Sequence, residues 1–136
     1  MRTTESRPPW MPEDNVIRAI QAGRWWDAIA VPQLLGLDAL QVIDHHTGHA
    51  PGPVIWDHHG PRPRLYFLVP AGTAATWAVP DTEALGATTF VGVPGATILE
   101  PPGPHWLCPP DPDDALALVD PGGLAQALRA VLAAAS

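Results

Sequence analysis

The chain of 136 residues has no lysine, a single cysteine and few charged residues, and each shortage excludes a class of protein. One cysteine, Cys108, excludes an internal disulfide and is typical of a reducing compartment. The N-terminal residues lack the apolar core of a signal peptide, and no apolar run reaches the roughly 20 residues that span a membrane. We therefore expect a cytoplasmic protein that makes no membrane contact.

Basic charge is also scarce. Arginine supplies all 7 basic residues, and the net charge is −7. A nucleic-acid-binding protein normally presents a basic face that displaces counterions from phosphates, whereas only Arg62 and Arg64 are neighbours here. We therefore expect no binding to duplex DNA, and we expect a protein or a small molecule as the partner. The sequence leaves the oligomeric state open.

Proline and glycine are abundant, with 18 and 12 residues, in a chain that is 46% hydrophobic. This composition predicts a buried core built from short elements that are joined by tight turns. Residues 1–11 are expected to form a flexible N-terminal tail, and residues 12–136 are expected to form a single small domain.

The stretch from Arg64 to Trp77 carries the strongest local signal. Residues 65–69 are an apolar run with apolar side chains on both faces, which predicts a central strand covered on both sides. Pro70 ends the run, because proline has no N–H to give to a ladder, and a glycine turn follows. A strand that enters a tight turn is a usual place for a ligand site. The expected ligand-binding residues are Arg62, Arg64, Tyr66, Gly72, Thr73 and Trp77.

Periodicity and the positions of proline and glycine predict the other elements. Helices are expected from Pro12 to Gly23, from Pro32 to the polar run 44–49, and over residues 123–135. Strands are expected at 26–31, 53–56, 65–69, 88–93, 97–99 and 106–107, with one helical turn at 74–77. Helices at the two ends and strands between them predict an α+β domain with a central mixed β-sheet and flanking helices.

Several of these segments, taken together, resemble a known family. They are residues 23–32, 52–55 and 64–70, the Gly72-Thr73 turn with Trp77, residues 104–106 and the Asp120-Pro121 helix start. They resemble small actinobacterial proteins with a bifunctional DNA primase/polymerase N-terminal domain, which are reduced relatives of the archaeo-eukaryotic primase fold. The resemblance covers residues 15–134 and implies a primase/polymerase-like fold.

The same resemblance points to a degenerate active site. Active members carry an Asp-x-Asp pair on the first strand, because paired carboxylates hold the two divalent ions that activate a 3′-hydroxyl. This chain has Asp27 followed by Ile29 in that stretch, and Arg64 stands where active members place a histidine before the Tyr-Phe strand. The resemblance therefore implies the fold and leaves a single carboxylate at the position of the metal ligands.

Two hypotheses follow from this pattern. The first is a non-catalytic accessory or regulatory domain that works by binding a nucleotide, a protein or a small metabolite. The alternative is a diverged metal-dependent nucleotidyl-transfer enzyme, with Asp27 and Asp57 as its catalytic residues and histidines nearby. A spatial cluster of Asp27, Asp57 and His58 would favour the enzyme.

The histidines support a third hypothesis, a histidine-rich metal-binding protein. If the segment 44–49 meets the turn 57–59, their nitrogen and oxygen atoms could surround Zn²⁺ or a similar ion. The alternative is that these are polar loop residues at the ends of helices and strands. No cofactor is identified by the sequence, and a divalent metal is the one candidate. The expected ligands are His45, His46, His49, His58 and His59.

Overall fold

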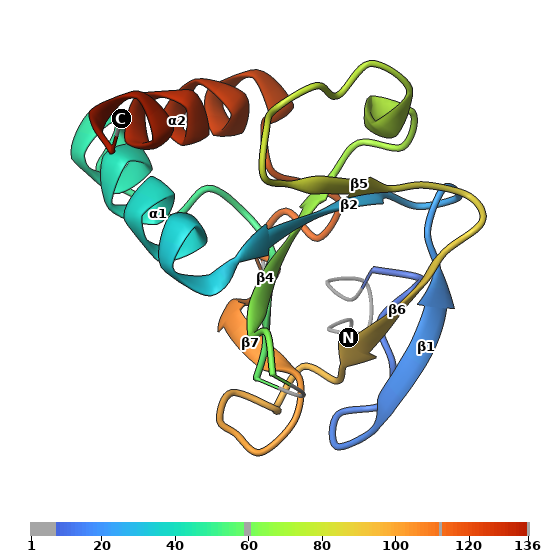
Figure 1. Cartoon of the computed structure of the whole chain (residues 1–136). Helices are drawn as coiled ribbons and strands as arrows, with labels where there is room; N and C mark the ends of the chain where they lie inside the picture. The colour runs from blue at the N-terminus through green and yellow to red at the C-terminus, as the bar shows by residue number, and fades with distance from the viewer. Residues whose placement is uncertain (1–7, 59–60, 112, 136) are drawn as a thin grey trace.

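The computed structural model describes residues 8–58, 61–111 and 113–135, which form an α+β arrangement (Figure 1). Strands β1 (Ile17–Gln21) and β2 (Asp27–Pro32) precede helix α1 (Gln33–Thr47). Strands β3 (Val54–Asp57) and β4 (Arg64–Val69) follow, and then the short 3-10 helix η2 (Thr73–Ala75). The remaining elements are β5 (Glu83–Leu85), β6 (Phe90–Pro94), β7 (His105–Cys108) and helix α2 (Pro121–Ala134).

Five strands form the main sheet in the order β5-β2-β4-β3-β7, and β1 pairs with β6 in a separate two-stranded ribbon. Strand β4 lies in the middle of the main sheet, where Phe67 is opposite Ile29 of β2 and Val54 of β3. The central position predicted for residues 65–69 is therefore confirmed. Every strand pairing in the described residues is antiparallel, which corrects the expectation of a mixed sheet.

Both helices pack on one face of the main sheet, which we call the helix face (Figure 1). Strand residues such as Ile29 and Phe67 share a core there with Ile43 of α1 and Leu128 of α2. The start of α2 is fixed by its own sequence. The Asp120 carboxylate accepts the N–H of Gly123 at 2.9 Å, and the proline that follows Asp120 needs no partner in the first turn.

The ribbon covers the opposite face of the sheet, which we call the ribbon face. Ala28 and Leu68 of the sheet share a second core there with Trp26, Trp106 and other apolar residues. Trp10 belongs to the same core, with only 5% of its surface exposed. The flexible tail predicted for residues 1–11 therefore does not extend to Trp10, and residues 1–7 lie outside the described residues.

Two of the predicted elements are absent from the described residues. The helix predicted from Pro12 to Gly23 is replaced by β1, because the β-branched Ile17 and Ile20 pair with β6 and favour extended backbone. The strand predicted at 97–99 is not formed. Strand β5 was not predicted, since it has only three residues and begins with an exposed glutamate.

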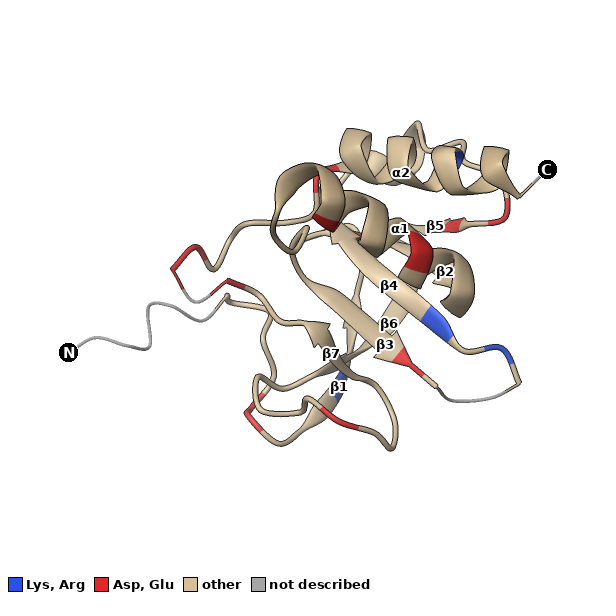
Figure 2. Ribbon diagram, turned by 90° about the vertical axis from the view of Figure 1, so that its left-hand side faces the viewer, with Lys and Arg blue, Asp and Glu red and all other residues tan. Residues whose placement is uncertain are grey.

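The described surface has few basic groups. Figure 2 shows two basic segments close together at the start of β4, while acidic segments are spread over helices, strands and loops. This distribution agrees with the net charge of −7. Neither α1 nor α2 is long and apolar enough to cross a membrane, as is true of every helix in the described part of the chain.

Candidate functional site

Asp27, the predicted metal-ligating residue of the first strand, is a buried hydrogen-bond acceptor. Its side chain is 2% exposed. One carboxylate oxygen, Oδ2, accepts the backbone N–H groups of Gly72 at 2.9 Å and Ala74 at 2.8 Å. Gly72 has a φ of +98°, in the left-handed region that glycine adopts at no steric penalty. Asp27 therefore caps the turn after β4 in the way that a side chain caps a helix N-terminus.

Asp57, the second predicted catalytic residue, lies far from Asp27. Asp27 is opposite Val69 at the end of β4, whereas Asp57 is opposite Arg64 at its beginning. Five residue steps along an antiparallel strand span roughly 17 Å. Two ions that share one substrate are about 4 Å apart. The structure therefore does not bring the two carboxylates together.

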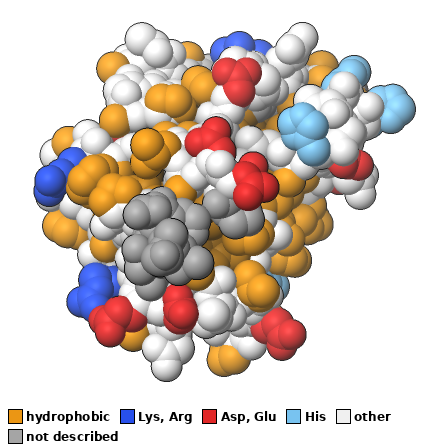
Figure 3. Space-filling view, turned by 180° about the vertical axis from the view of Figure 1, so that it is seen from behind, with side chains coloured by type: hydrophobic (Ala, Val, Ile, Leu, Met, Phe, Trp, Pro, Cys, Tyr) orange, Lys and Arg blue, Asp and Glu red, His pale blue; other side chains and the backbone are white. Residues whose placement is uncertain are grey.

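The predicted histidine ligands also fall into separate places. His45 and His46 occupy the last turn of α1, and Figure 3 shows histidine side chains gathered at one corner of the molecule. His58 stacks on Trp56, whose indole N–H donates to Gln33 at the first turn of α1. The length of α1 separates these positions by roughly 20 Å. His59 lies outside the described residues, and those that are described contain no group of three or more potential ligands placed to hold a metal ion.

The predicted ligand-binding residues are divided between the two ends of β4. Arg62 and Arg64 line a hollow of about 880 Å³ near the start of the strand. The guanidinium of Arg64 lies 5.5 Å from the centre of the Tyr66 ring and 3.3 Å from the carboxylate of Glu83. Gly72 and Thr73 follow the far end of β4, where they form the turn that Asp27 caps.

Trp77, the last residue of that predicted set, is fixed beside the arginine hollow. Its indole N–H donates to the Thr82 hydroxyl at 2.8 Å, and this hydroxyl in turn donates to the carbonyl of Val79 at 2.8 Å. Thr82 lines the hollow. Three polar residues that line the hollow, Arg64, Thr82 and Glu83, are therefore already engaged with other protein groups.

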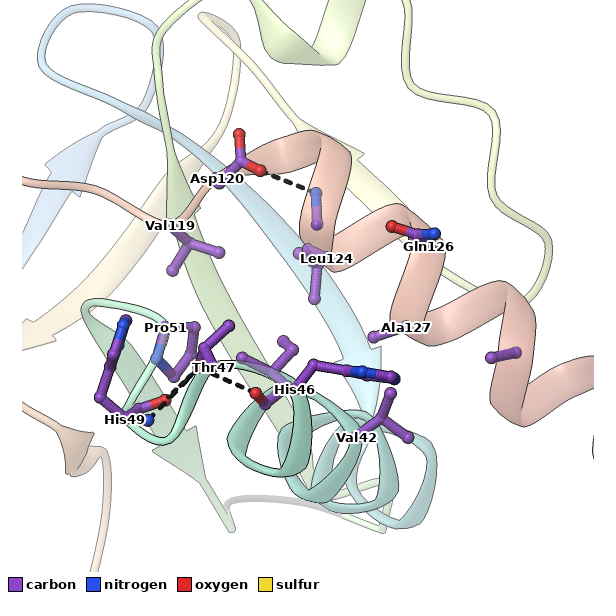
Figure 4. A pocket seen from close by; sticks show the side chains of 13 residues that line it. Val42, His46, Thr47, His49, Pro51, Val119, Asp120, Leu124, Gln126 and Ala127 are labelled. Atoms are coloured by element: carbon purple, nitrogen blue, oxygen red, sulfur yellow. Dashed lines mark hydrogen bonds between the residues drawn. The ribbon is translucent and has the colours of Figure 1, made fainter.

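A second hollow lies between α1 and α2 (Figure 4) and has a volume of about 480 Å³. We call it the helix groove. Its floor is apolar and is formed by Ile43 of α1, Leu124 and Ala127 of α2, and Val119, which precedes α2. All four residues are at most 9% exposed. Polar side chains surround this floor: His46 and Thr47 in the last turn of α1, His49 just after it, Asp120 at the N-cap of α2, and Gln126 within α2.

The polar groups of the helix groove are held in part by the backbone. The Thr47 hydroxyl donates to the Ile43 carbonyl at 2.8 Å, and a ring nitrogen of His49 lies 3.0 Å from the Ala50 carbonyl. Asp120 uses one carboxylate oxygen for the Gly123 N–H. Figure 4 shows His46 and Gln126 on opposite walls. The groove thus combines an apolar floor with a few fixed polar groups, which is the usual composition of a small-molecule site.

A third hollow, of about 570 Å³, continues the helix groove toward the end of α2. Val42, His46 and Ala130 line both of these hollows. The sequence predicted each helix and grouped His46 with a metal site, but it missed the groove. Apolar periodicity shows which face of a helix is buried, whereas the packing of α1 against α2 depends on the sheet beneath them.

Cys108 is not part of any of these sites. Burial raises the pKa of its thiol, because a charged thiolate is poorly solvated there. A raised pKa keeps the thiol neutral and unreactive, which agrees with a packing role.

Comparisons with family models, with curated proteins and with solved structures gave no match to this chain. No relative therefore indicates a function or a ligand for this chain.

Proposed function

We propose that this chain is a non-catalytic domain that binds a small organic molecule in the helix groove. The observation that carries the proposal is the groove itself, an apolar floor that joins α1 and α2 beneath a rim of imidazole, amide and carboxylate groups. Its volume of about 480 Å³ lies within the range of small-ligand sites. The ligand has an apolar body for the floor and a polar end for the rim.

The role of Asp27 supports a binding function over nucleotidyl transfer. Its Oδ2 atom already accepts two backbone N–H groups, so a metal ion there would compete with the cap of the turn after β4. The distance between Asp27 and Asp57 along β4 also argues against nucleotidyl transfer, because the two carboxylates are too far apart to share a pair of metal ions. The proposal includes common ancestry with primase/polymerase domains. In this chain, the helix groove is the binding site.

A second candidate function is nucleotide binding at the arginine hollow. What favours it is that Arg62 and Arg64 line one cavity, next to the ring of Tyr66. Arginine binds phosphate through parallel hydrogen bonds, and an aromatic ring stacks on a base. The ion pair of Arg64 with Glu83 opposes this function, because an anionic ligand would have to displace a carboxylate.

A fragment titration followed by amide chemical shifts tests the proposal. We expect small amphipathic ring compounds to shift the signals of His46, Gln126 and Ala130 at millimolar concentration. Ala130→Trp places an indole in the groove and abolishes these shifts. Ala133→Trp is the matched control, because Ala133 is exposed on the same helix and lines neither hollow.

Two outcomes would contradict the proposal. One is that fragments bind Ala130→Trp as well as they bind the unmodified chain. The other is that nucleoside phosphates shift the signals around Arg62 and Arg64 while nothing shifts the groove, which would move the function to the arginine hollow.

A further inference from the structure

The walls of the helix groove carry negative charge and no positive charge. With histidine counted as neutral, the only charged side chain that lines the groove is Asp120. The third hollow, which continues the groove, adds a second carboxylate, that of Asp38. The chain has no lysine, and Arg129, the one arginine of α2, lines neither hollow. An anionic ligand would therefore find no partner of opposite charge in the groove.

At the end of α1, the hydrogen-bond donors of the groove are already in use. The Thr47 hydroxyl has one proton, and it donates this proton to the carbonyl of Ile43 at 2.8 Å. Nδ1 of His49 lies 3.0 Å from the carbonyl of Ala50. A carbonyl can only accept, so Nδ1 carries the ring proton, and the second nitrogen of the neutral ring is an acceptor. Thr47 and His49 therefore offer acceptors to a ligand.

The carboxylate of Asp120 is open to a ligand. Its Oδ2 atom accepts the N–H of Gly123, whereas Oδ1 has no hydrogen-bond partner among the described residues. The side chain is exposed, and a Cβ atom at position 122 or 123 would lie 3.8 or 3.1 Å from Oδ2. Both positions hold glycine, which is unfavourable inside a helix, and neither has the positive φ that would require it. Their lack of a side chain leaves the approach to the carboxylate free.

The two helix ends at this part of the groove agree with a negative potential. Figure 4 shows Asp120, at the start of α2, across the groove from Thr47 and His49, at and just after the end of α1. A helix carries about half a negative unit charge at its C-terminal end and about half a positive one at its N-terminal end. The full charge of Asp120 exceeds that of the helix end that it caps. The net potential at this end of the groove is therefore negative.

We infer that the ligand of the helix groove is an amphipathic cation, a protonated primary amine on an apolar body. An ammonium group has three N–H donors and no acceptor, so it matches the acceptors of Thr47, His49 and Asp120. The apolar body of the ligand covers the floor of the groove. This inference rests on the proposed function, because it names the kind of molecule that the groove binds.

Three probes with one naphthalene body test the inference. They are naphthylmethylamine, which is protonated at neutral pH, the uncharged naphthylmethanol and the anionic naphthoate. Each is titrated into the full chain at about pH 7.5, where histidine side chains are largely neutral, and the amide signals of the groove are followed. We expect the amine to bind about fivefold more tightly than the alcohol, which corresponds to about 1 kcal/mol, the upper end for an exposed ion pair. Naphthoate is expected to bind most weakly.

Asp120→Asn identifies the partner of the amine. Asparagine keeps an oxygen for the N–H of Gly123 and is an equally good N-cap residue, so α2 keeps its start. It removes the charge, so the amine loses its advantage over the alcohol while the alcohol binds as before. Asp44→Asn is the matched control. Asp44 is exposed in the last turn of α1 and lines none of the three hollows, so its loss leaves the preference for the amine intact.

The outcomes separate this inference from the proposed function. Binding of the alcohol or of naphthoate in the groove as tightly as the amine would overturn the inference and leave the proposed function standing. A preference for the amine that persists in Asp120→Asn would do the same. Ala130→Trp fills the groove with an indole and so identifies the signals that report binding there. If no probe shifts these signals, or if the shifts survive in Ala130→Trp, the inference and the proposed function are both wrong.

Discussion

The two faces of the five-stranded sheet are packed in different ways. The helix face buries Phe67 and aliphatic side chains under two regular helices. The ribbon face contains three tryptophan rings and lies under a two-stranded ribbon and the segment 8–12. A two-stranded ribbon has little stability of its own. From this difference we expect the helix face to contribute most of the stability and the cover of the ribbon face to adjust more easily to a substitution.

The largest effect is expected at the centre of the helix face. Phe67 is fully buried in the middle strand, between its neighbours on β2 and β3. Phe67→Ala leaves a cavity that the surrounding helices and strands cannot fill. It should therefore lower the free energy of unfolding by about 3–5 kcal/mol. Urea denaturation monitored by circular dichroism measures this. A loss below about 1 kcal/mol would show that the helix face is not the main core.

Substitutions of Asp27 test the hydrogen bonds by which its carboxylate caps the turn after β4. Asp27→Ala leaves the N–H groups of Gly72 and Ala74 without their acceptor, and should cost about 3 kcal/mol of folding stability. Asp27→Asn keeps a side-chain oxygen that can accept, and should lose about half as much. Thermal denaturation of both variants checks the order. Equal stability of Asp27→Ala and the unmodified chain would remove the structural role that we assign to Asp27.

Leu68 gives the direct contrast between the faces, because it follows Phe67 and points to the ribbon face. It is as fully buried as Phe67. Leu68→Ala should nevertheless lower the free energy of unfolding by only about 2 kcal/mol, at the low end for a buried leucine, because we expect the two-stranded ribbon to shift and fill part of the cavity. A loss as large as that of Phe67→Ala would mean that the two faces are equally rigid.

The smallest effect is expected at the surface ion pair of Arg64 and Glu83. The two side chains are 40% and 65% exposed, so water screens their attraction. Arg64→Ala should change the free energy of unfolding by less than about 1 kcal/mol. If the same variant lost binding of a nucleoside phosphate without losing stability, the arginine hollow would become the leading site.

Local patterns predicted the elements that depend on local chemistry. Strand β4 was predicted because apolar side chains occupy both of its faces, and α2 was predicted over residues 123–135 because apolar residues recur on one side of a helix. Strand β1 was missed, because its apolar spacing also fits one face of a helix. Only its pairing with β6 shows that the segment is a strand. The three residues of β5 are too few to leave a pattern.

The sites were harder to predict than the elements. The sequence singled out Asp27 as a catalytic residue, but the backbone N–H groups that its carboxylate accepts, those of Gly72 and Ala74, are 45 and 47 residues away in the chain. The helix groove depends on how α1 packs against α2, and the ring contacts of Trp10 with Trp26 and Trp106 join the N-terminal segment to distant parts of the chain. Each of these features is created by contacts between distant segments, which one sequence does not display.

The central proposal is that Asp27 caps a turn instead of holding a metal ion, and that the domain binds ligands without transferring nucleotides. A Mn²⁺ titration followed by amide signals tests it most directly, because the paramagnetic ion broadens the signals nearest to it. The amides of Gly72 and Ala74 donate to Asp27 and would report an ion there. We predict that both signals lose no more intensity than those of exposed acidic residues. Their selective loss at micromolar Mn²⁺, abolished by Asp27→Asn, would contradict the account.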